Sequence, residues 1–252
     1  MFKKYTSIEN SYRQKYILKA VGEYPELQKQ KYIIQEKIDG SNLQLFFEPC
    51  RKMRVGKRSA FLKEDENFYD YQQTLNNYDF SEIQKFVELT GHTVRLFGEL
   101  FGPGIQKRVN YGDEKQFMAF DVEIDGQMQT QEQFFNFMQD MDALDITVPV
   151  VAYADNLNDA LAYNVDFDSK ILGIANNASE GVVIKPYHNE YTLHSGHRFV
   201  IKKKSDSFSE KMKVKTKRPI EASAEVVALN LKFREYINEN RVQGIFSKYG
   251  PL

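Results

Sequence analysis

The sequence contains one cysteine, Cys50, and no tryptophan among its 252 residues. A single cysteine excludes an internal disulfide and a cysteine-rich zinc site, and it suits a reducing compartment. No apolar run is long enough to span a membrane, and no signal-like segment opens the chain, so we expect a cytoplasmic protein with no membrane partner. No Gly-rich loop of the P-loop or Rossmann kind is present, so nucleotide binding would need another device.

The composition is that of a folded protein with a sizeable core, because 42% of the residues are hydrophobic and 27% are charged. The net charge of -1 hides an uneven distribution along the chain. Between Lys202 and Arg218 there are eight basic residues and two acidic ones. Such a stretch either forms a solvated loop or contacts a polyanion.

Hydrophobic alternation and turn residues predict many short strands with a few helices. We predict a helix from the capping box Thr6-Ser7-Ile8-Glu9 to about Lys19, and two more over 131–141 and 223–239. An Asp125-Gly126 hairpin turn should join two of the strands. Strands are predicted over 32–37, 43–48, 52–57, 93–99, 116–124, 127–129, 147–152, 181–185 and 198–202. This order predicts the α+β class, with antiparallel sheets around a cleft.

The most informative segment is 36–42, which reads Glu-Lys-Ile-Asp-Gly-Ser-Asn. Lys37 follows an apolar strand, Gly40 marks a turn, and a second strand begins at Leu43. The lysine is therefore held at the mouth of a sheet by rigid backbone on both sides, which is the confinement that a nucleophilic amine needs. The alternative is a surface lysine beside an Asp-Gly hairpin turn.

Further charged and aromatic residues stand at strand ends later in the chain. Each has a plain structural interpretation as a solvated strand end or a core aromatic. Lys202 and Lys204 alternate along one strand and so point to the same side, where two ammonium groups call for an anion or an acid between them. The full set comprises Arg58, Glu99, Phe120, Asp121, Glu180, Lys185, Lys202 and Lys204.

Taken in order, these motifs resemble those of the covalent nucleotidyltransferase superfamily of ligases and capping enzymes. The likeness is greatest to the RNA ligase 2 family, which includes the phage double-strand RNA ligase and the trypanosome RNA-editing ligases. Residues 1–10, 101–107 and 208–211 also resemble the phage enzyme, and the likeness covers about residues 1–220. We therefore expect an adenylyltransferase domain over 1–220, with an ATP cleft. A C-terminal helical segment over 221–252 would be the start of a truncated second domain.

The resemblance implies that Lys37 takes AMP from ATP and that Glu36 and Phe120 frame the adenine. Arg58 and Glu99 would bind the ribose. Asn42 would act later, near the adenylated RNA end. The remaining residues would serve the phosphates and the metal: Lys202 and Lys204 on the α-phosphate, Lys185 nearby, Glu180 on Mg²⁺ or Mn²⁺, and Asp121 in support.

Asp39 departs from the pattern, because the RNA ligase 2 family usually has histidine there. An aspartate would meet the same need through a magnesium ion, so we name Asp39 as a catalytic residue and, with Glu180, as a metal ligand. Asp39 also fits DNA ligases and capping-type guanylyltransferases, which stay as alternatives, whereas Ser41 and Asn42 favour an RNA ligase. A non-catalytic nucleic-acid-binding protein is the remaining alternative.

The expected chemistry has three displacements. The Lys37 amine first attacks the α-phosphorus of ATP and releases pyrophosphate, and an RNA 5′-phosphate then takes the AMP from the lysine. A 3′-hydroxyl finally displaces the AMP, which forms a phosphodiester. Cations at Lys202, Lys204 and the metal would disfavour the ammonium form of Lys37 and neutralise the phosphoryl oxygens. The expected partner is RNA with 5′-phosphate and 3′-hydroxyl ends, duplex or nicked. The setting would be the cytosol or a phage- or virus-infected cell. With so short a C-terminus, we expect efficient joining of pre-adenylated ends and weak engagement of nicks.

Overall fold

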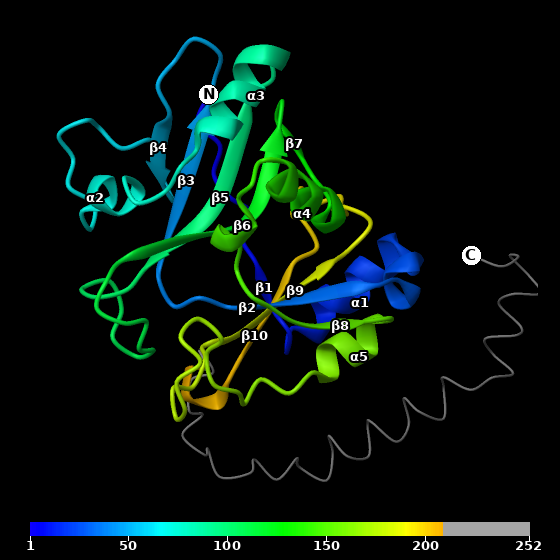
Figure 1. Cartoon of the computed structure of the whole chain (residues 1–252). Helices are drawn as coiled ribbons and strands as arrows, with labels where there is room; N and C mark the ends of the chain where they lie inside the picture. The colour runs from blue at the N-terminus through cyan, green and yellow to red at the C-terminus, as the bar shows by residue number, and fades with distance from the viewer. Residues whose placement is uncertain (209–252) are drawn as a thin grey trace, which may run out of the picture. The chain divides into compact units, whose positions relative to one another are not determined.

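The computed structural model describes residues 1–208, and its strands form two five-stranded sheets (Figure 1). Sheet A has the strand order β1-β10-β9-β2-β8, and sheet B has the order β4-β3-β5-β6-β7. All neighbouring strands are antiparallel except β1 and β10, which are parallel. Sheet A comprises β1 (Glu9–Asn10), β2 (Tyr32–Glu36), β8 (Val150–Ala154), β9 (Gly181–Pro186) and β10 (Ile201–Lys204). Sheet B comprises β3 (Ser41–Phe47), β4 (Arg54–Lys57), β5 (Val94–Phe101), β6 (Gln116–Ile124) and β7 (Gln127–Met128).

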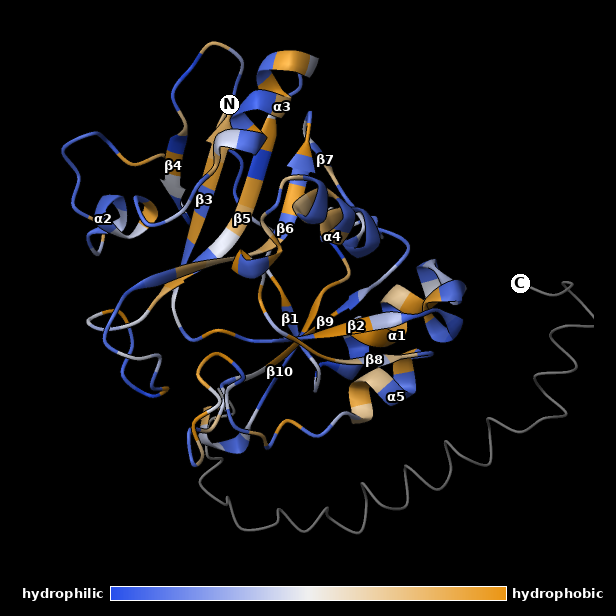
Figure 2. Ribbon diagram, in the orientation of Figure 1, coloured by the Kyte–Doolittle hydropathy of each residue, from blue (hydrophilic) through white to orange (hydrophobic). Residues whose placement is uncertain are grey.

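One face of each sheet is covered by helices and holds an apolar core. On sheet A, α1 (Gln14–Glu23), the 3-10 helix η1 (Pro25–Lys29) and α5 (Leu157–Ala162) pack against side chains of the central strands. On sheet B, the core includes residues of α2 (Tyr71–Leu75), α3 (Ser81–Thr90) and α4 (Gln131–Asp140). In Figure 2 the strands of both sheets carry many hydrophobic residues, as burial of one face requires.

The two sheets are in contact, because Lys185 of β9 pairs with Asp121 of β6. A third apolar cluster joins Ile38, Phe101 and Tyr111 to Phe208 of the 3-10 helix η3 (Asp206–Phe208). The segment 37–40 connects β2 of sheet A to β3 of sheet B, so it crosses from one sheet to the other. The alternative of a hairpin turn at this point is therefore wrong, since β2 and β3 do not pair.

Most predicted strands are confirmed, and 116–124 has the predicted bounds. The hairpin turn is confirmed, with positive φ at Asp125 and Gly126 (49° and 79°), as a two-residue turn of the primed type requires. The helix over 131–141 is confirmed over 131–140, and Thr130 caps it in a capping box with Gln133. The predicted helix over 223–239 and the predicted domain boundary after residue 220 lie outside the described residues.

The prediction for the N-terminus is wrong. The segment that was expected to open a helix at Thr6 instead contributes β1, which pairs with β10, and α1 begins at Gln14. The strand-forming option wins because pairing at the edge of sheet A satisfies backbone groups that a single capping box cannot. Helix α3 was missed, although Ile83 and Val87 give a helical spacing and Gly91 adopts the left-handed conformation that ends a helix. Within residues 1–208, no helix combines the length and the apolar character needed to cross a bilayer.

Candidate active site

Lys37, Glu180 and Lys204 meet at the ends of three neighbouring strands of sheet A. Lys37 follows β2, Glu180 precedes β9, and Lys204 ends β10, opposite Gly181 in the register. The Lys37 amide donates a hydrogen bond to the Gly181 carbonyl at 2.9 Å, which fixes the start of the side chain. The Glu180 carboxylate pairs with Lys37 Nζ at 2.6 Å through Oε2 and with Lys204 Nζ at 3.0 Å through Oε1.

These three side chains are only partly open to solvent. The exposed fractions are 18% for Lys37, 11% for Lys204 and 3% for Glu180. From the sequence, an acid or an anion was expected between Lys202 and Lys204. In the structure, Glu180 lies between Lys204 and Lys37. Lys203 points to the other face, where its ammonium donates to the carbonyls of Leu161 and Tyr163 at the end of α5. This opposite orientation of Lys203 agrees with the predicted alternation, in which Lys202 and Lys204 share a face.

Two glycines allow the close approach of backbone on which this geometry depends. A Cβ at Gly181 would lie 2.2 Å from the Lys203 carbonyl oxygen, and φ there is +138°. A Cβ at Gly40 would lie 2.5 Å from the Leu100 carbonyl oxygen, so the crossing segment can rest directly on β5. Both positions therefore require glycine for contact with neighbouring backbone.

Asp39 is held by residues of the loop between β5 and β6. The Arg108 guanidinium donates from Nε and Nη2 to the two Asp39 carboxylate oxygens, at 3.2 and 2.9 Å. The Asp39 amide donates to the Tyr111 hydroxyl at 2.8 Å. In the part of the chain that the structure describes, no group of three histidine, cysteine or acidic residues converges as a ready-made metal cage.

Glu99 and Asn42 lie opposite each other on β5 and β3. Burial raises the pKa of Glu99 to about 8; Lys37 and Arg58 oppose this shift, whereas Glu180 and Asp39 add to it. The carboxyl group is therefore largely protonated at neutral pH. Asn42 Nδ2 donates to the Gly98 carbonyl at 3.3 Å, while its buried Oδ1 has no partner among residues 1–208. Arg58 is exposed just beyond the end of β4.

Glu36 has one satisfied carboxylate oxygen and one that is buried without a partner in the described residues. Oε2 accepts a hydrogen bond from the Lys170 amide at 2.7 Å, and Oε1 is the unpartnered atom. Burial raises the pKa of Glu36, although hydrogen bonds from Ser169 and Lys170 oppose the shift. A buried acceptor with no partner suits a ligand that brings a donor.

Phe120 occupies a β-bulge. Phe97 pairs with Asp121 and Gly98 pairs with Ala119, so Phe120 is the extra residue of β6 and its carbonyl leaves the ladder. That carbonyl accepts a hydrogen bond from Lys185 Nζ at 2.6 Å instead. The half-buried ring packs against the third apolar cluster, which includes Ile38 next to Lys37.

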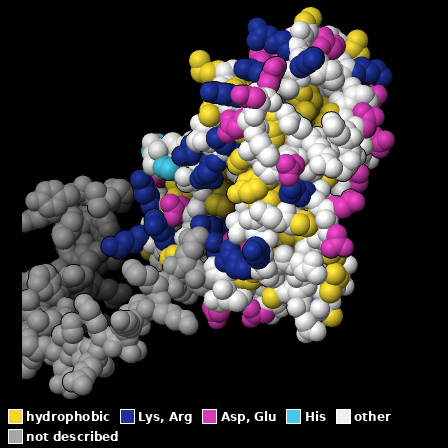
Figure 3. All heavy atoms as spheres, turned by 90° about the vertical axis from the view of Figure 1, so that its left-hand side faces the viewer, with side chains coloured by type: hydrophobic (Ala, Val, Ile, Leu, Met, Phe, Trp, Pro, Cys, Tyr) yellow, Lys and Arg dark blue, Asp and Glu magenta, His cyan; other side chains and the backbone are white. Residues whose placement is uncertain are grey.

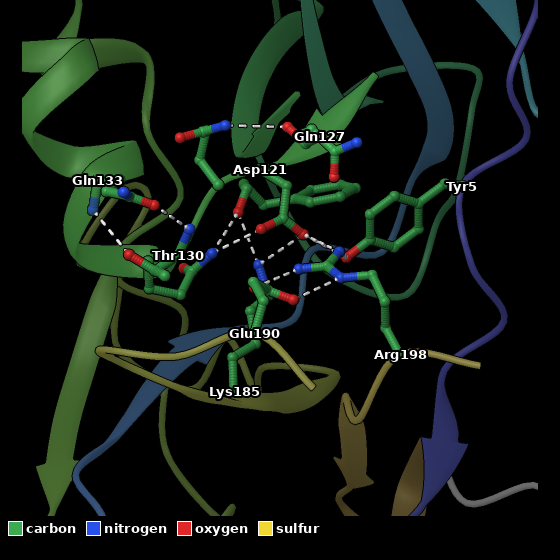
Figure 4. Close-up of polar contacts among 11 residues, drawn as sticks. Tyr5, Asp121, Gln127, Thr130, Gln133, Lys185, Glu190 and Arg198 are labelled. Carbon is green, nitrogen blue, oxygen red and sulfur yellow. Dashed lines mark hydrogen bonds and ion pairs between the residues drawn. The ribbon is translucent and has the colours of Figure 1, made fainter. Parts of the chain in front are cut away.

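A buried polar network next to Phe120 joins the two sheets, because Lys185 of β9 binds both the Phe120 carbonyl and Asp121 of β6 (Figure 4). Asp121 accepts hydrogen bonds from the Tyr5 hydroxyl and from Gln131, and it pairs with Lys185 and Arg198, each at 3.2 Å. Arg198 in turn makes a two-pronged ion pair with Glu190. Burial alone would raise the pKa of Asp121, but Lys185 and Arg198 lower it below its ordinary value.

The structure thus brings most of the predicted site residues together but separates Lys185 from Lys204. Lys185 lies in the network next to Phe120, whereas Lys204 lies beside Lys37. Sequence reasoning missed the residues that hold the site from other segments, because none of them belongs to a motif near Lys37. They are Tyr5, Arg108, Tyr111, Gln131, Glu190 and Arg198.

A family model described as RNA ligase matches residues 30–204, which is more than half of the chain and includes every predicted site residue. The chain belongs to the RNA ligase family. This membership favours an RNA ligase over the DNA ligase and capping-enzyme alternatives that Asp39 had kept open.

Solved structures of Naegleria gruberi RNA ligase show the same fold. A mutant with ATP and Mn superposes with a TM-score of 0.61 at 20% identity, over 84% of this chain and 58% of that one. Another mutant, with AMP and Mn, gives a TM-score of 0.59 at 20% identity and the same coverage. These matches confirm the predicted α+β nucleotidyltransferase fold. The chain spans about 58% of the length of these structures.

Proposed function

We propose that this protein is an ATP-dependent RNA ligase that stores AMP on Lys37 before passing it to an RNA end. The observation that carries the proposal is the position of the Lys37 amine, which shares the Glu180 carboxylate with Lys204 at the ends of three neighbouring strands. The complexes of the Naegleria gruberi ligase with ATP or AMP and Mn support ATP and a divalent cation as cofactors here.

The adenine would be recognised by Glu36 and Phe120. The unpartnered Glu36 Oε1 is an acceptor, which suits the exocyclic amine of adenine. The Phe120 ring would stack on the base. The β-bulge leaves Phe120 without a partner residue on β5. Glu99, mostly protonated near neutral pH, and exposed Arg58 would bind the ribose edge. Asn42 would use its buried Oδ1 later, on the RNA end.

The carboxylates fit a divalent cation that enters with the nucleotide. Magnesium is usually bound by one or two carboxylates together with substrate phosphates and water, and Glu180 and Asp39 supply that number. Both acids are already paired with cations of the protein, so each must give up an ion pair to serve as a ligand. When bound, the metal would neutralise charge on the phosphate oxygens.

Attack by Lys37 requires that the ion pair with Glu180 opens and that the ammonium group loses a proton to water, because the lone pair of an ammonium nitrogen is occupied by that proton. Lys204, and Lys202 on the same face, would then turn to the α-phosphate and stabilise the charge that grows on it. Lys185 would act as a positioning residue through the Phe120 carbonyl. The AMP held on nitrogen would pass to an RNA 5′-phosphate and be displaced by a 3′-hydroxyl.

We further propose that the RNA ends are duplex or nicked and that joining takes place in the cytosol or in a phage- or virus-infected cell. Lys and Arg side chains gather over the middle and lower part of the face in Figure 3, which suits contact with a phosphate backbone. The division into an adenylyltransferase domain over 1–220 and a helical segment over 221–252 remains part of this proposal.

The test is to mix the protein with Mg²⁺ and ATP labelled at the α-phosphate and then to denature it. The label should stay on the protein, be lost in acid, survive base and be absent from Lys37→Ala. A labelled Lys37→Ala protein, or an unlabelled wild-type protein, would refute the proposal.

Asp39 is the one observation that favours a DNA ligase or a capping-type enzyme. Parallel labelling with GTP, and joining assays with DNA in place of RNA ends, separate these alternatives. Failure with every nucleotide would favour the alternative of a non-catalytic nucleic-acid-binding protein.

A further inference from the structure

Arg108 brings a positive charge to Asp39, two residues along the chain from Lys37, and none of the roles above uses it. It lies in the loop over 102–115, between β5 and β6, and binds both carboxylate oxygens of Asp39. The Arg108 side chain is 50% exposed, whereas that of Asp39 is 5% exposed. Its guanidinium also lies over the Phe208 ring, 4.4 Å from the ring centre. The arginine is thus well anchored and still open to solvent.

The Arg108 guanidinium has hydrogen-bonding capacity that the protein leaves unused. A guanidinium carries five N–H groups, and the contacts with Asp39 occupy one on Nε and one on Nη2. The other N–H groups make no hydrogen bond to any residue from 1 to 208. A planar fork of donors matches the oxygens of a phosphate better than an ammonium group does.

The charge of the surrounding pocket explains why a polyphosphate would need this arginine. Burial is the first cause that raises the pKa of Tyr111, and the charges of Glu36, Asp39 and Glu180 raise it further, so the three carboxylates lie within electrostatic reach of one hydroxyl. A triphosphate that enters such a pocket is repelled unless cations meet it. Lys204, and Lys202 on the same face, would serve the α-phosphate, so the β- and γ-phosphates call for a further cationic side chain beside any metal ion.

We propose that Arg108 binds the β- and γ-phosphates of ATP, and hence the departing pyrophosphate, during transfer of AMP to Lys37. This role rests on the proposed function. In that step the uncharged amine forms the N–P bond while the bond from the α-phosphorus to the bridging oxygen breaks. The electron pair leaves on pyrophosphate, and the amine nitrogen gives its extra proton to water. Pyrophosphate takes no part in the later steps, so the contribution of Arg108 belongs to the first step alone.

The first test compares Arg108→Ala with the wild-type chain in three assays. These are self-adenylylation against ATP concentration, release of ATP from the purified lysyl-AMP protein against pyrophosphate concentration, and sealing of chemically pre-adenylated RNA. Loss of one charged hydrogen-bonding group predicts a fall of about 10- to 100-fold in kcat/KM for ATP and for pyrophosphate. Sealing should change by less than about threefold, on the scale of an exposed-charge effect. Lys115→Ala, which removes a cation from the same loop, is the control and should match the wild type.

A purely structural role, in which Arg108 only neutralises Asp39, makes a different prediction. Asp39→Asn removes the charge that needs neutralising, so on that view Arg108→Ala would cost nothing further in the Asp39→Asn background. Our proposal predicts that the double variant still has a KM for pyrophosphate about tenfold above that of Asp39→Asn alone. Equal KM values, or an equal loss in sealing of pre-adenylated RNA, would overturn the role of Arg108. A wild-type protein that acquires no label would instead overturn the proposed function.

Discussion

Replacement of Lys185 by methionine should destabilise the protein and weaken ATP use together, although Lys185 lies away from Lys37 and Lys204. Lys185 is 2% exposed, and it binds both the Phe120 carbonyl and the Asp121 carboxylate. Methionine keeps most of the length of the side chain, since only the terminal atom is lost, and removes the charge. The buried network of Asp121, Glu190, Lys185 and Arg198 would then carry one uncompensated negative charge.

The size of the effect follows from the geometry. At 3.2 Å and an effective dielectric constant of about 20, the attraction between Lys185 and Asp121 is about 5 kcal/mol. Part of this is offset, because burial disfavours the charged lysine and lowers its pKa, and methionine removes that penalty. Removal of one partner of a buried pair typically costs about 3 to 5 kcal/mol. We therefore expect a loss of about 3 kcal/mol in the free energy of unfolding, a large part of a typical total of about 5 to 15 kcal/mol.

Urea unfolding followed by far-UV circular dichroism measures this loss, and Lys115→Met serves as the control for an exposed pair. The double variant Lys185→Met/Asp121→Asn restores charge balance, so its loss should fall short of the sum of the two single losses by at least about 2 kcal/mol. Additive losses would mean that the two groups do not act as a pair. A Lys185→Met protein as stable as Lys115→Met would refute the view that this network holds the two sheets together.

Three further predictions concern single residues of the site. Glu36→Gln should lower labelling with ATP by about tenfold and raise it with GTP, because the Lys170 amide keeps the amide oxygen and the NH2 group would then face the base. Gly181→Ala should lower the free energy of unfolding far more than Gly104→Ala. A Cβ at position 181 would meet backbone at 2.2 Å, whereas a Cβ at position 104 would meet nothing within 4 Å, so Gly104→Ala should cost only about 1 to 2 kcal/mol for its positive φ. Glu99→Gln should melt at a higher temperature than the wild type, and the difference should grow as the pH rises from 5 to 8.5. Burial raises the pKa of Glu99 to about 8, so above its ordinary pKa the carboxyl ionises more readily in the unfolded chain than in the folded one, which opposes folding.

The sequence predicts well those parts of the site that stand next to strand ends. Lys37, Glu180 and Lys204 each adjoin a strand whose alternation or apolar run is visible in the chain, and neighbouring antiparallel strands bring such ends together. The fold class follows for the same reason. Helix α3 was missed because no capping side chain marks its start, whereas a capping box at Thr130 marks the start of α4.

The rest of the site depends on contacts between segments that have no local signature. The bulge at Phe120 follows from the register between β5 and β6, which no pattern within either strand specifies. Arg108 reaches Asp39 from a loop, and Tyr5 reaches Asp121 from the N-terminal segment. Lys185 shows the consequence, since its motif suggested a position near the α-phosphate, whereas in the structure it is buried against the Phe120 carbonyl and Asp121.

The acids of this pocket pose a problem for any polyanionic substrate, and the structure offers a consistent answer. Glu180 is balanced by two lysines and Asp39 by Arg108, while Glu99 stays largely protonated near neutral pH. These three carboxyl groups are therefore not left as uncompensated charges in front of the triphosphate. Arrival of phosphates would draw the lysines and Arg108 away from their acids, since a phosphate carries more charge than a carboxylate. The same exchange that binds the nucleotide would free Glu180 and Asp39 oxygens for a cation, so nucleotide and metal binding should be cooperative, and ATP affinity should fall when the metal is withheld.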